Sequence, residues 1–271
     1  MFDPTNYIEE ILGQRATLGF NPSAKDYRCP FIDRTCVKRS AADPNKPYPV
    51  CSIRKKTSGA PMCVCPKRFH EINFLRDVVK HAWPGKKPNN PRFAAEVKME
   101  GFGNVDFVIA DTPDGTQINQ FLSVELQAID ITGSVRPAYD ALVAGQELEK
   151  SPVYGLNWKN VYKRYTEQLI SKGYYHHHWG SKIVAVIQDE VYDYICNKAT
   201  FMRNRDITSS EVNIIFMSYK FQDDPKGSGR KKPVLDKIEG THHTNLQNAI
   251  LYNTPPPREN FCQRIKNALR R

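Results

Sequence analysis

The run Val105-Asp106-Phe107-Val108-Ile109, followed by Ser123-Val124-Glu125-Leu126-Gln127, decides the fold of this chain. Val105, Phe107 and Ile109 share one face of the first run, and the second run alternates polar and apolar side chains, which is the period of a β-strand with one buried face. Asp106 lies on the polar side of the first strand, and Glu125 lies on the polar side of the second. Because the turn sequence Pro113-Asp114-Gly115 lies between them, the two strands are predicted to pair as neighbours.

The rest of the chain supplies helices and further strands around this pair. Strands are predicted at 93–99, 104–109, 121–131, 183–187 and 212–219, and helices at 69–83, 136–148 and 157–172. A short helical pattern occupies residues 1–20. This order predicts a mixed α/β sheet flanked by helices.

Charge indicates the class of partner. The formal net charge of the 271 residues is +10, and residues 1–70 hold twelve Lys/Arg against six Asp/Glu. Such an excess favours a polyanion, because neutralised phosphates release counterions. A merely basic, soluble protein is the alternative. No run approaches the ~20 apolar residues of a membrane span, and no secretory signal is recognisable, so we expect no membrane association and a reducing cytoplasm.

Five of the seven cysteines lie in a polar segment, residues 21–66, that cannot bury much apolar surface without a staple. They are Cys29, Cys36, Cys51, Cys63 and Cys65. In a reducing compartment clustered cysteines are more often metal ligands than disulfides. A closed tetrahedral site needs four thiolates, and zinc or iron would suit them. The alternative is a set of buried structural cysteines.

The two strands carry the chemistry. Magnesium takes oxygen ligands and keeps several waters, so one or two carboxylates on a rigid sheet suffice. Asp106 and Glu125 fit that role, and Glu96 on the preceding strand could add a third carboxylate. The alternative is that these residues are solvent-facing positions of a hairpin. Polar residues inside runs this apolar need a reason, however, and a metal-dependent phosphodiesterase site gives one.

The spacing resembles the core of the PD-(D/E)xK nucleases, in which an Asp ends one strand and a Glu-x-Lys lies on the next. Gln127 stands in the Lys position. A neutral amide cannot accept a proton as a general base, so Gln127 can only orient water by hydrogen bonds. Deprotonation would then rest on the metal and on solvent or substrate phosphate.

The chain also resembles the NotI-type restriction endonucleases over most of residues 27–195. The cysteine segment, Asn157-Trp158-Lys159 and Val186-Ile187-Gln188-Asp189 carry this resemblance. It implies a structural four-thiolate site holding iron, with ligands Cys29, Cys36, Cys51 and Cys65. Cys63 would be spare, although chemically it could replace any of the four. It also implies catalytic roles for Asp106, Glu125, Gln127 and, less directly, Glu96.

The sequence therefore predicts a Type II restriction endonuclease that hydrolyses duplex DNA at a specific, GC-rich palindrome, with magnesium. We expect a homodimer, paired functionally with a DNA methyltransferase, in a prokaryotic cytoplasm. Residues 1–68 would form the metal-binding element and 69–271 the PD-(D/E)xK catalytic domain with a basic tail. The alternatives are a non-specific or repair nuclease of the same superfamily, or a metal-stapled DNA-binding module without chemistry.

Several basic groups are candidates for contact with DNA. Arg54-Lys55-Lys56, Lys67-Arg68 and Arg230-Lys231-Lys232 are predicted to contact phosphates. The basic, aromatic helix 157–172, which includes Lys172, could lie near DNA. His176-His177-His178 is expected in a solvated loop after that helix, and residues 261–271 form a basic amphipathic tail.

Overall fold

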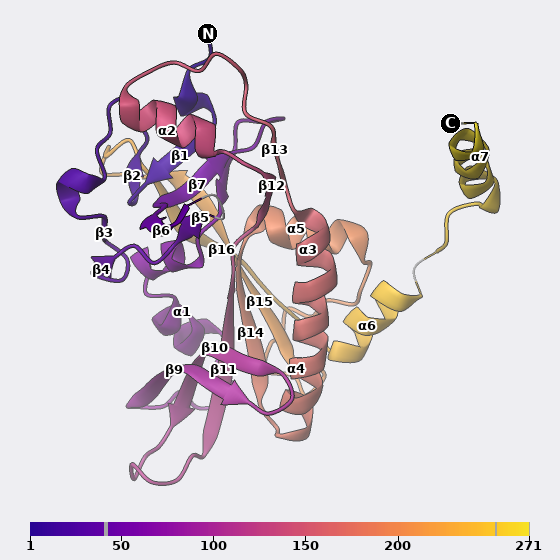
Figure 1. Cartoon of the computed structure of the whole chain (residues 1–271). Coiled ribbons are helices and arrows are strands. Elements are labelled where there is room, and N and C mark those ends of the chain that lie inside the picture. The colour runs from indigo at the N-terminus through magenta and orange to yellow at the C-terminus, as the bar shows by residue number, and fades with distance from the viewer. Residues whose placement is uncertain (41–42, 253, 271) are drawn as a thin grey trace.

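The computed structural model describes residues 1–40, 43–252 and 254–270, and its centre is a six-stranded sheet (Figure 1). In spatial order the strands are β16 (Lys231–Thr241), β15 (Ile214–Asp223), β14 (Lys182–Gln188), β11 (Gln120–Gln127), β10 (Gly103–Asp111) and β9 (Pro91–Met99). Strands β9, β10 and β11 are antiparallel neighbours, β11, β14 and β15 run parallel, and β16 is antiparallel to β15. The predicted mixed sheet is confirmed.

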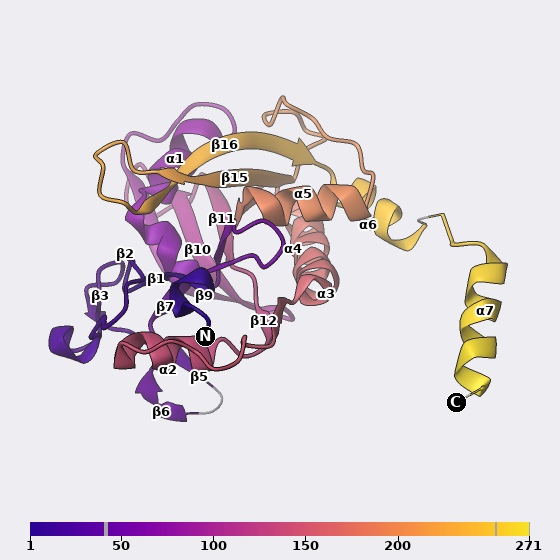
Figure 2. The same ribbon diagram turned by 90° about the horizontal axis from the view of Figure 1, so that it is seen from above.

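Helices cover both faces of this sheet, which explains why its central strand β14 is buried throughout. On one face, α1 (Phe74–His81) packs through Phe74 and Val78. On the other face lie α4 (Thr166–His178), which belongs to the crossover from β11 to β14, and α5 (Asp189–Lys198) (Figures 1 and 2). The crossover also contains α2 (Arg136–Ala144), α3 (Trp158–Asn160) and the π-helical turn η4 (Val161–Tyr165).

The N-terminal part forms a second, smaller sheet in the order β2-β1-β7-β8. It consists of β1 (Ile8–Ile11), β2 (Gln14–Arg15), β7 (Val50–Arg54) and β8 (Pro61–Cys63). The helical pattern predicted in residues 1–20 is wrong, because Ile8–Ile11 is a strand with all four residues buried. Full burial includes Glu9 and Glu10, which pair with Arg54 and Arg68. These carboxylates made the run look amphipathic in the sequence.

Short elements complete the N-terminal part and the crossover. They are η1 (Pro4–Asn6), η2 (Ser23–Lys25), β3 (Arg28–Cys29), β4 (Arg34–Thr35), β5 (Arg39–Ser40), β6 (Asp43–Pro47), η3 (Pro66–Glu71), β12 (Ile131–Gly133) and β13 (Tyr154–Leu156). One apolar cluster joins Ile8 and Ile53 of the small sheet to Leu142 of α2 and Leu169 of α4. The domain boundary at residue 68 stays a prediction.

Several predicted boundaries differ from the structure. The helix expected at 69–83 is divided into η3 and α1, because Asn73 caps α1 by accepting from the Arg76 N–H. The strand expected at 121–131 ends at Gln127. Helix α4 continues through His178, so the loop expected at the histidine run is wrong.

The C-terminal part contains two further helices, α6 (His243–Leu251) and α7 (Arg258–Leu269). The second of these is the predicted basic amphipathic tail, whose last residue, Arg271, lies outside the described residues. In the described parts of the chain, no helix is long and apolar enough to cross a membrane.

Candidate active site

Asp106 and Glu125 project from the same face of the sheet, on adjacent strands. Phe107 of β10 pairs directly with Val124 of β11 in the antiparallel ladder. Directly opposed residues share a face and neighbours along a strand alternate, so Asp106 and Glu125 both point to the face opposite to Phe107 and Val124. This is the α4 face, since Phe107 and Val124 pack into the apolar cluster that contains α1. The geometry that the sequence predicted for this pair is present.

A hydrogen bond across the strands holds Asp106 in place. The backbone N–H of Leu126 donates to Asp106 Oδ2 at 2.8 Å, so the side chain replaces a carbonyl as acceptor in the ladder. Burial raises the pKa of Asp106 above its ordinary value, and the nearby Glu96 raises it further, whereas the Leu126 N–H lowers it. One carboxylate oxygen is thus used to position the side chain.

Glu96 lies on β9, the strand next to β10, and we call Glu96, Asp106 and Glu125 the carboxylate row. The neighbours of Glu96, Ala95 and Val97, pair with Phe107 and Val105, which places Glu96 across from Asp106. Its backbone has a φ of 53°, the left-handed region that few residues other than glycine adopt. Such local strain is often found where a side chain must be directed to a functional site. Its charge reaches both other carboxyls, because Glu96 raises the pKa of Asp106 and of Glu125.

Burial has a large effect on the pKa of Glu125. Glu125 is 7% exposed, and burial raises its pKa to about 7, with smaller contributions in the same direction from Asp106 and Glu96. The ammonium of Lys172 acts in the opposite direction. A cation near Asp106 and Glu125 would relieve the repulsion that raises the pKa of Glu125, and carboxylate oxygens are ligands that suit a hard divalent ion.

Lys172 is the residue that sequence reasoning misplaced. It was counted among the basic residues of a helix that could lie near DNA, but it is 2% exposed, forms an ion pair with Glu125 and donates to the Asn104 carbonyl at 3.0 Å. Its neighbour Gly173 allows α4 to pack close enough to the sheet to bury Lys172. A Cβ at this position would lie 2.8 Å from Ile214 Cγ1 and would push α4 off the sheet. The available signal was its spacing from Leu169, three residues along the buried face of the helix.

Two more polar groups belong to this face. Gln127 lies two residues beyond Glu125 on the same side of β11, and its amide donates to the Ala128 carbonyl. The Tyr165 hydroxyl is buried and has no hydrogen-bond partner among the described residues. Burial raises its pKa well above the ordinary value, and Glu125 and Asp106 add to this effect. An unpaired buried hydroxyl beside these carboxylates indicates space for water or a ligand.

The cysteine segment is less completely assembled. Among residues 1–40, 43–252 and 254–270, no three His, Cys, Asp or Glu side chains gather closely enough to hold a metal ion, and this applies to the cysteines and the carboxylates alike. The thiols are nonetheless near one another, since Cys65 acts electrostatically on Cys29, Cys36 and Cys51. Burial is the main cause that raises the pKa of each of these three thiols.

Lys38 lies among these thiols. Its ammonium donates to the Val50 and Val64 carbonyls at 2.8 and 2.9 Å, and its charge interacts with Cys36, Cys51, Cys63 and Cys65. Burial lowers the pKa of Lys38, and the thiols raise it in turn. A cation held here by two carbonyls would favour the thiolate forms that a metal requires.

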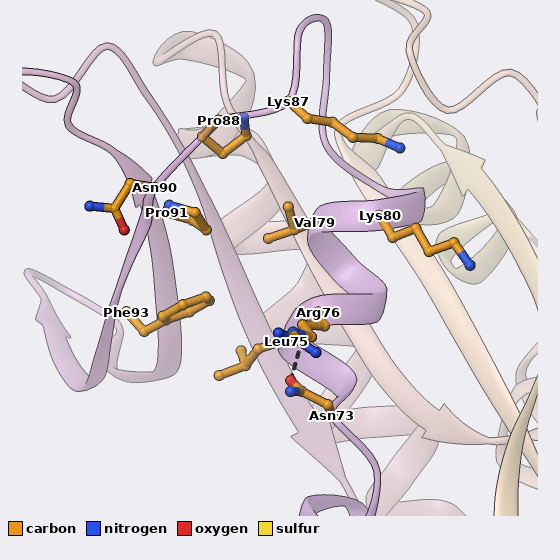
Figure 3. Close-up of a pocket in the computed structure, with 10 residues that line it drawn as sticks. All are labelled: Asn73, Leu75, Arg76, Val79, Lys80, Lys87, Pro88, Asn90, Pro91 and Phe93. Atoms are coloured by element: carbon orange, nitrogen blue, oxygen red, sulfur yellow. Dashed lines mark hydrogen bonds between the residues drawn. The ribbon is translucent and has the colours of Figure 1, made fainter.

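A cavity of about 760 Å³ lies elsewhere. It is lined by α1 and the start of β9, with Leu75, Val79 and Phe93 as its apolar wall and Arg76, Lys80 and Lys87 as its basic edge (Figure 3). Phe93 pairs with Ile109, whose side chain belongs to the α1 face. The cavity is therefore on the opposite face of the sheet from Asp106 and Glu125, and it is not their substrate pocket.

Two of the basic clusters predicted to contact DNA include structural residues. Arg68 is fully buried, where it makes a bidentate pair with Glu10 and a second pair with Glu71. Arg230 pairs with Glu71 and donates to the Gly13 carbonyl. The prediction of phosphate contacts is wrong for Arg68, since no surface of it is free. Lys67 remains a candidate, because its charge reaches Asp106 and lowers the pKa of that carboxyl.

Comparison with protein families shows which family the chain belongs to. Residues 11–231 match the family model described as Restriction endonuclease NotI. The chain belongs to the NotI restriction endonuclease family. The match includes the cysteine segment, the row of carboxylates and Lys172. No curated protein and no solved structure matches the chain.

Membership of the NotI family establishes the class of activity. The protein is a Type II site-specific deoxyribonuclease, a hydrolase that cuts DNA, and its substrate is double-stranded. The resemblance inferred from the cysteine and Glu-x-Gln motifs is thereby confirmed. The alternative of a DNA-binding module without chemistry is set aside.

Proposed function

We propose that this NotI-family enzyme hydrolyses DNA with magnesium held by Asp106 and Glu125 on a PD-(D/E)xK core, with Glu96 assisting. The observation that carries the proposal is the convergence of two carboxylates from adjacent strands on one face, next to a buried lysine. Bound magnesium would polarise the scissile phosphate and lower the pKa of a water molecule. Two carboxylates suffice for magnesium, because it retains several waters.

The protein's own residues would prepare this site in distinct ways. Asp106, fixed by the Leu126 N–H, directs its other oxygen into the site. Gln127 would orient the attacking water by hydrogen bonds, without accepting its proton. Lys172 would supply the positive charge that Gln127 lacks, since its ammonium is already next to Glu125. Lys172 would also compete with magnesium for the same carboxylate.

The cysteine segment would be structural. Cys29, Cys36, Cys51 and Cys65, with Cys63 as the substitute, would hold iron or zinc and leave no open coordination position for substrate. Cys29 is the last residue of β3, Cys51 lies within β7 and Cys65 follows β8, so the metal would join separate short segments. This staple would order the basic residues 1–68 for contact with DNA.

The enzyme would act on a palindrome, GC-rich by analogy with its family, as a symmetric homodimer in which each active site cuts one strand. Its partner in a restriction-modification system would be a DNA methyltransferase that protects the same site. We place this activity in the cytoplasm of a prokaryotic cell, where the DNA is.

A plasmid digest tests the proposed chemistry. With magnesium, the purified protein should produce discrete bands, whereas a smear would indicate cleavage without sequence specificity. With EDTA the plasmid should stay intact. Cleavage at full rate in EDTA would remove magnesium from the mechanism.

Substitution of Glu125 tests the assignment of the site. Glu125→Ala should bind DNA as the parent does and lose about 10³-fold in cleavage, which corresponds to about 4 kcal/mol of the barrier. Glu125→Gln should behave in the same way, and it keeps an oxygen that can accept from Lys172, so a folding defect is separable. Asp111→Asn, at the far end of β10, is the matched control and should cut normally. Normal cleavage by Glu125→Gln would show that the site is misplaced.

A further inference from the structure

Helix α7 stands away from the rest of the molecule (Figures 1 and 2). All of its described side chains are exposed except Cys262, which is partly covered. Its apolar residues nevertheless form a stripe: Phe261, Ile265 and Leu269 recur every four residues and are 66%, 42% and 82% exposed. A helix with an apolar stripe of this kind normally buries it against another surface.

The molecule also has an unfilled apolar groove. A cavity of about 510 Å³ lies between α4 and α6, with Tyr162, Ile170, Ile250 and Leu251 among its lining residues. Leu251 is 63% exposed at its edge. An apolar groove between two helices can receive the apolar face of an amphipathic helix.

We infer that α7 of a second copy of this chain fills the groove between α4 and α6, so that two subunits exchange their C-terminal helices. The inference deepens the proposed function, on which the expectation of a symmetric dimer rests. Both α6 and α7 lie beyond residues 11–231, the part matched by the NotI family. The proposed occupant and one wall of the groove therefore lie outside the part of the chain that matches the family.

The connection between α6 and α7 favours a second copy over the same chain. Pro255, Pro256 and Pro257 precede α7, and Pro257 has the extended conformation of φ −51° and ψ 136°. Proline runs are semi-rigid spacers that extend by about 3.1 Å per residue. The groove adjoins the last turn of α6, and the chain after α6 leads away from the molecule (Figures 1 and 2), so self-docking would require the chain to reverse its direction between α6 and α7. Exchange between subunits requires no reversal.

The charges of α7 also suit the groove. Helix α7 carries Arg258, Arg264 and Lys266 against one acidic residue, Glu259. Arg264 and Lys266 lie on either side of the apolar stripe at helical spacing. The groove offers Glu167 to a basic helix and Lys163 to Glu259.

Association of the full-length protein tests the inference. Ile265→Asp should raise the dimer dissociation constant at least ~100-fold in sedimentation equilibrium, because a carboxylate would be buried in an apolar groove. Leu251→Asp, at the groove, should have the same effect. Asn267→Asp, on the polar side of α7, is the matched control and should leave the dissociation constant unchanged. A dimer unaffected by both Ile265→Asp and Leu251→Asp would overturn the inference.

A disulfide distinguishes exchange from self-docking. Ser171→Cys places a thiol in the groove, and the native Cys262 lies in α7. Mild oxidation should give a covalent dimer that disappears in Ser171→Cys/Cys262→Ser. A bond within one chain, seen as a faster monomer band, would overturn exchange, and so would no bond in a protein that is dimeric. Cleavage is measured separately: a wild type that never cuts would count against the carboxylate site and leave the docking result standing.

Discussion

The two faces of strands β10 and β11 use the same backbone for different purposes. On the α1 face, Ile109, Leu122 and Val124 are fully buried in an apolar cluster. On the α4 face, Asp106 and Glu125 project from the positions between them, and Glu125 is buried together with a lysine. Burying charge lowers stability unless the charge is paired. Burial of apolar side chains on the α1 face therefore offsets the destabilisation on the α4 face. Residues that stabilise the fold and residues of the candidate active site therefore alternate along the same two strands.

The largest test of this separation is Leu122→Ala. Leu122 is three residues from Glu125 on the same strand, and its side chain is completely buried on the α1 face. Removal of a buried leucine costs about 3 kcal/mol through lost burial and the cavity that remains. We expect the free energy of unfolding, measured with urea, to fall by about that amount. Cleavage per folded molecule at low temperature should be unchanged.

The Glu125→Gln enzyme should give the inverse pattern, with cleavage lost and the urea midpoint nearly retained. If Leu122→Ala abolished cleavage while the protein remained folded, the two faces would be coupled and the comparison would fail.

A second test concerns the charge pair on the α4 face. Lys172→Met should lower the maximal cleavage rate about tenfold, the equivalent of about 1.4 kcal/mol, because a positive charge beside the phosphate is lost. It should also lower the magnesium concentration that gives half-maximal cleavage, because the competing ammonium is gone. Cleavage rates over a magnesium titration measure both effects.

Lys182→Met is the matched control for this pair. Lys182 is also buried, but its ammonium donates to the Ile207 and Ser209 carbonyls, away from the carboxylates. It should leave the magnesium dependence unchanged. A Lys172→Met enzyme with the magnesium dependence of the wild type would reduce Lys172 to a purely structural partner of Glu125.

The sequence predicted the sheet and the carboxylate row because alternation is local information. Asp106 and Glu125 interrupt apolar runs, and a turn between them implies pairing, so their common face followed. The fold was less predictable where tertiary contacts override local pattern. Glu9 and Glu10 lie in a buried strand only because Arg54 and Arg68, over forty residues away, neutralise them.

Lys172 and the histidine run show that local sequence pattern is equally limited in predicting which side chains of a helix are buried. A lysine or histidine among polar neighbours is ordinarily solvated, and no local pattern shows which side of α4 meets the sheet at Gly173. Strand β16 and helix α6 also were not predicted, because β16 alternates weakly and is covered on only part of its length.

The smallest expected effect comes from His176, which is buried on the α4 face with no hydrogen-bond partner for either ring nitrogen among the described residues. Burial lowers its pKa to about 4, and Lys172 adds to this effect. An unfolded histidine takes up a proton near pH 6.5, so protonation favours the unfolded state. Stability from this residue is complete above pH 6.5 and is lost as the pH falls toward 4.

At pH 5.5 the loss should be about 1 kcal/mol relative to pH 7.5. His176→Phe, which fits the neighbouring Phe121 and Trp179 rings, should remove this part of the pH dependence in urea unfolding. His243 has a pKa lowered by burial to about 4 as well, so the variant should retain a residual dependence of similar sign. An unaltered pH profile in His176→Phe would mean that His176 reaches water, and the α4 face would then be more open to solvent than the α1 face.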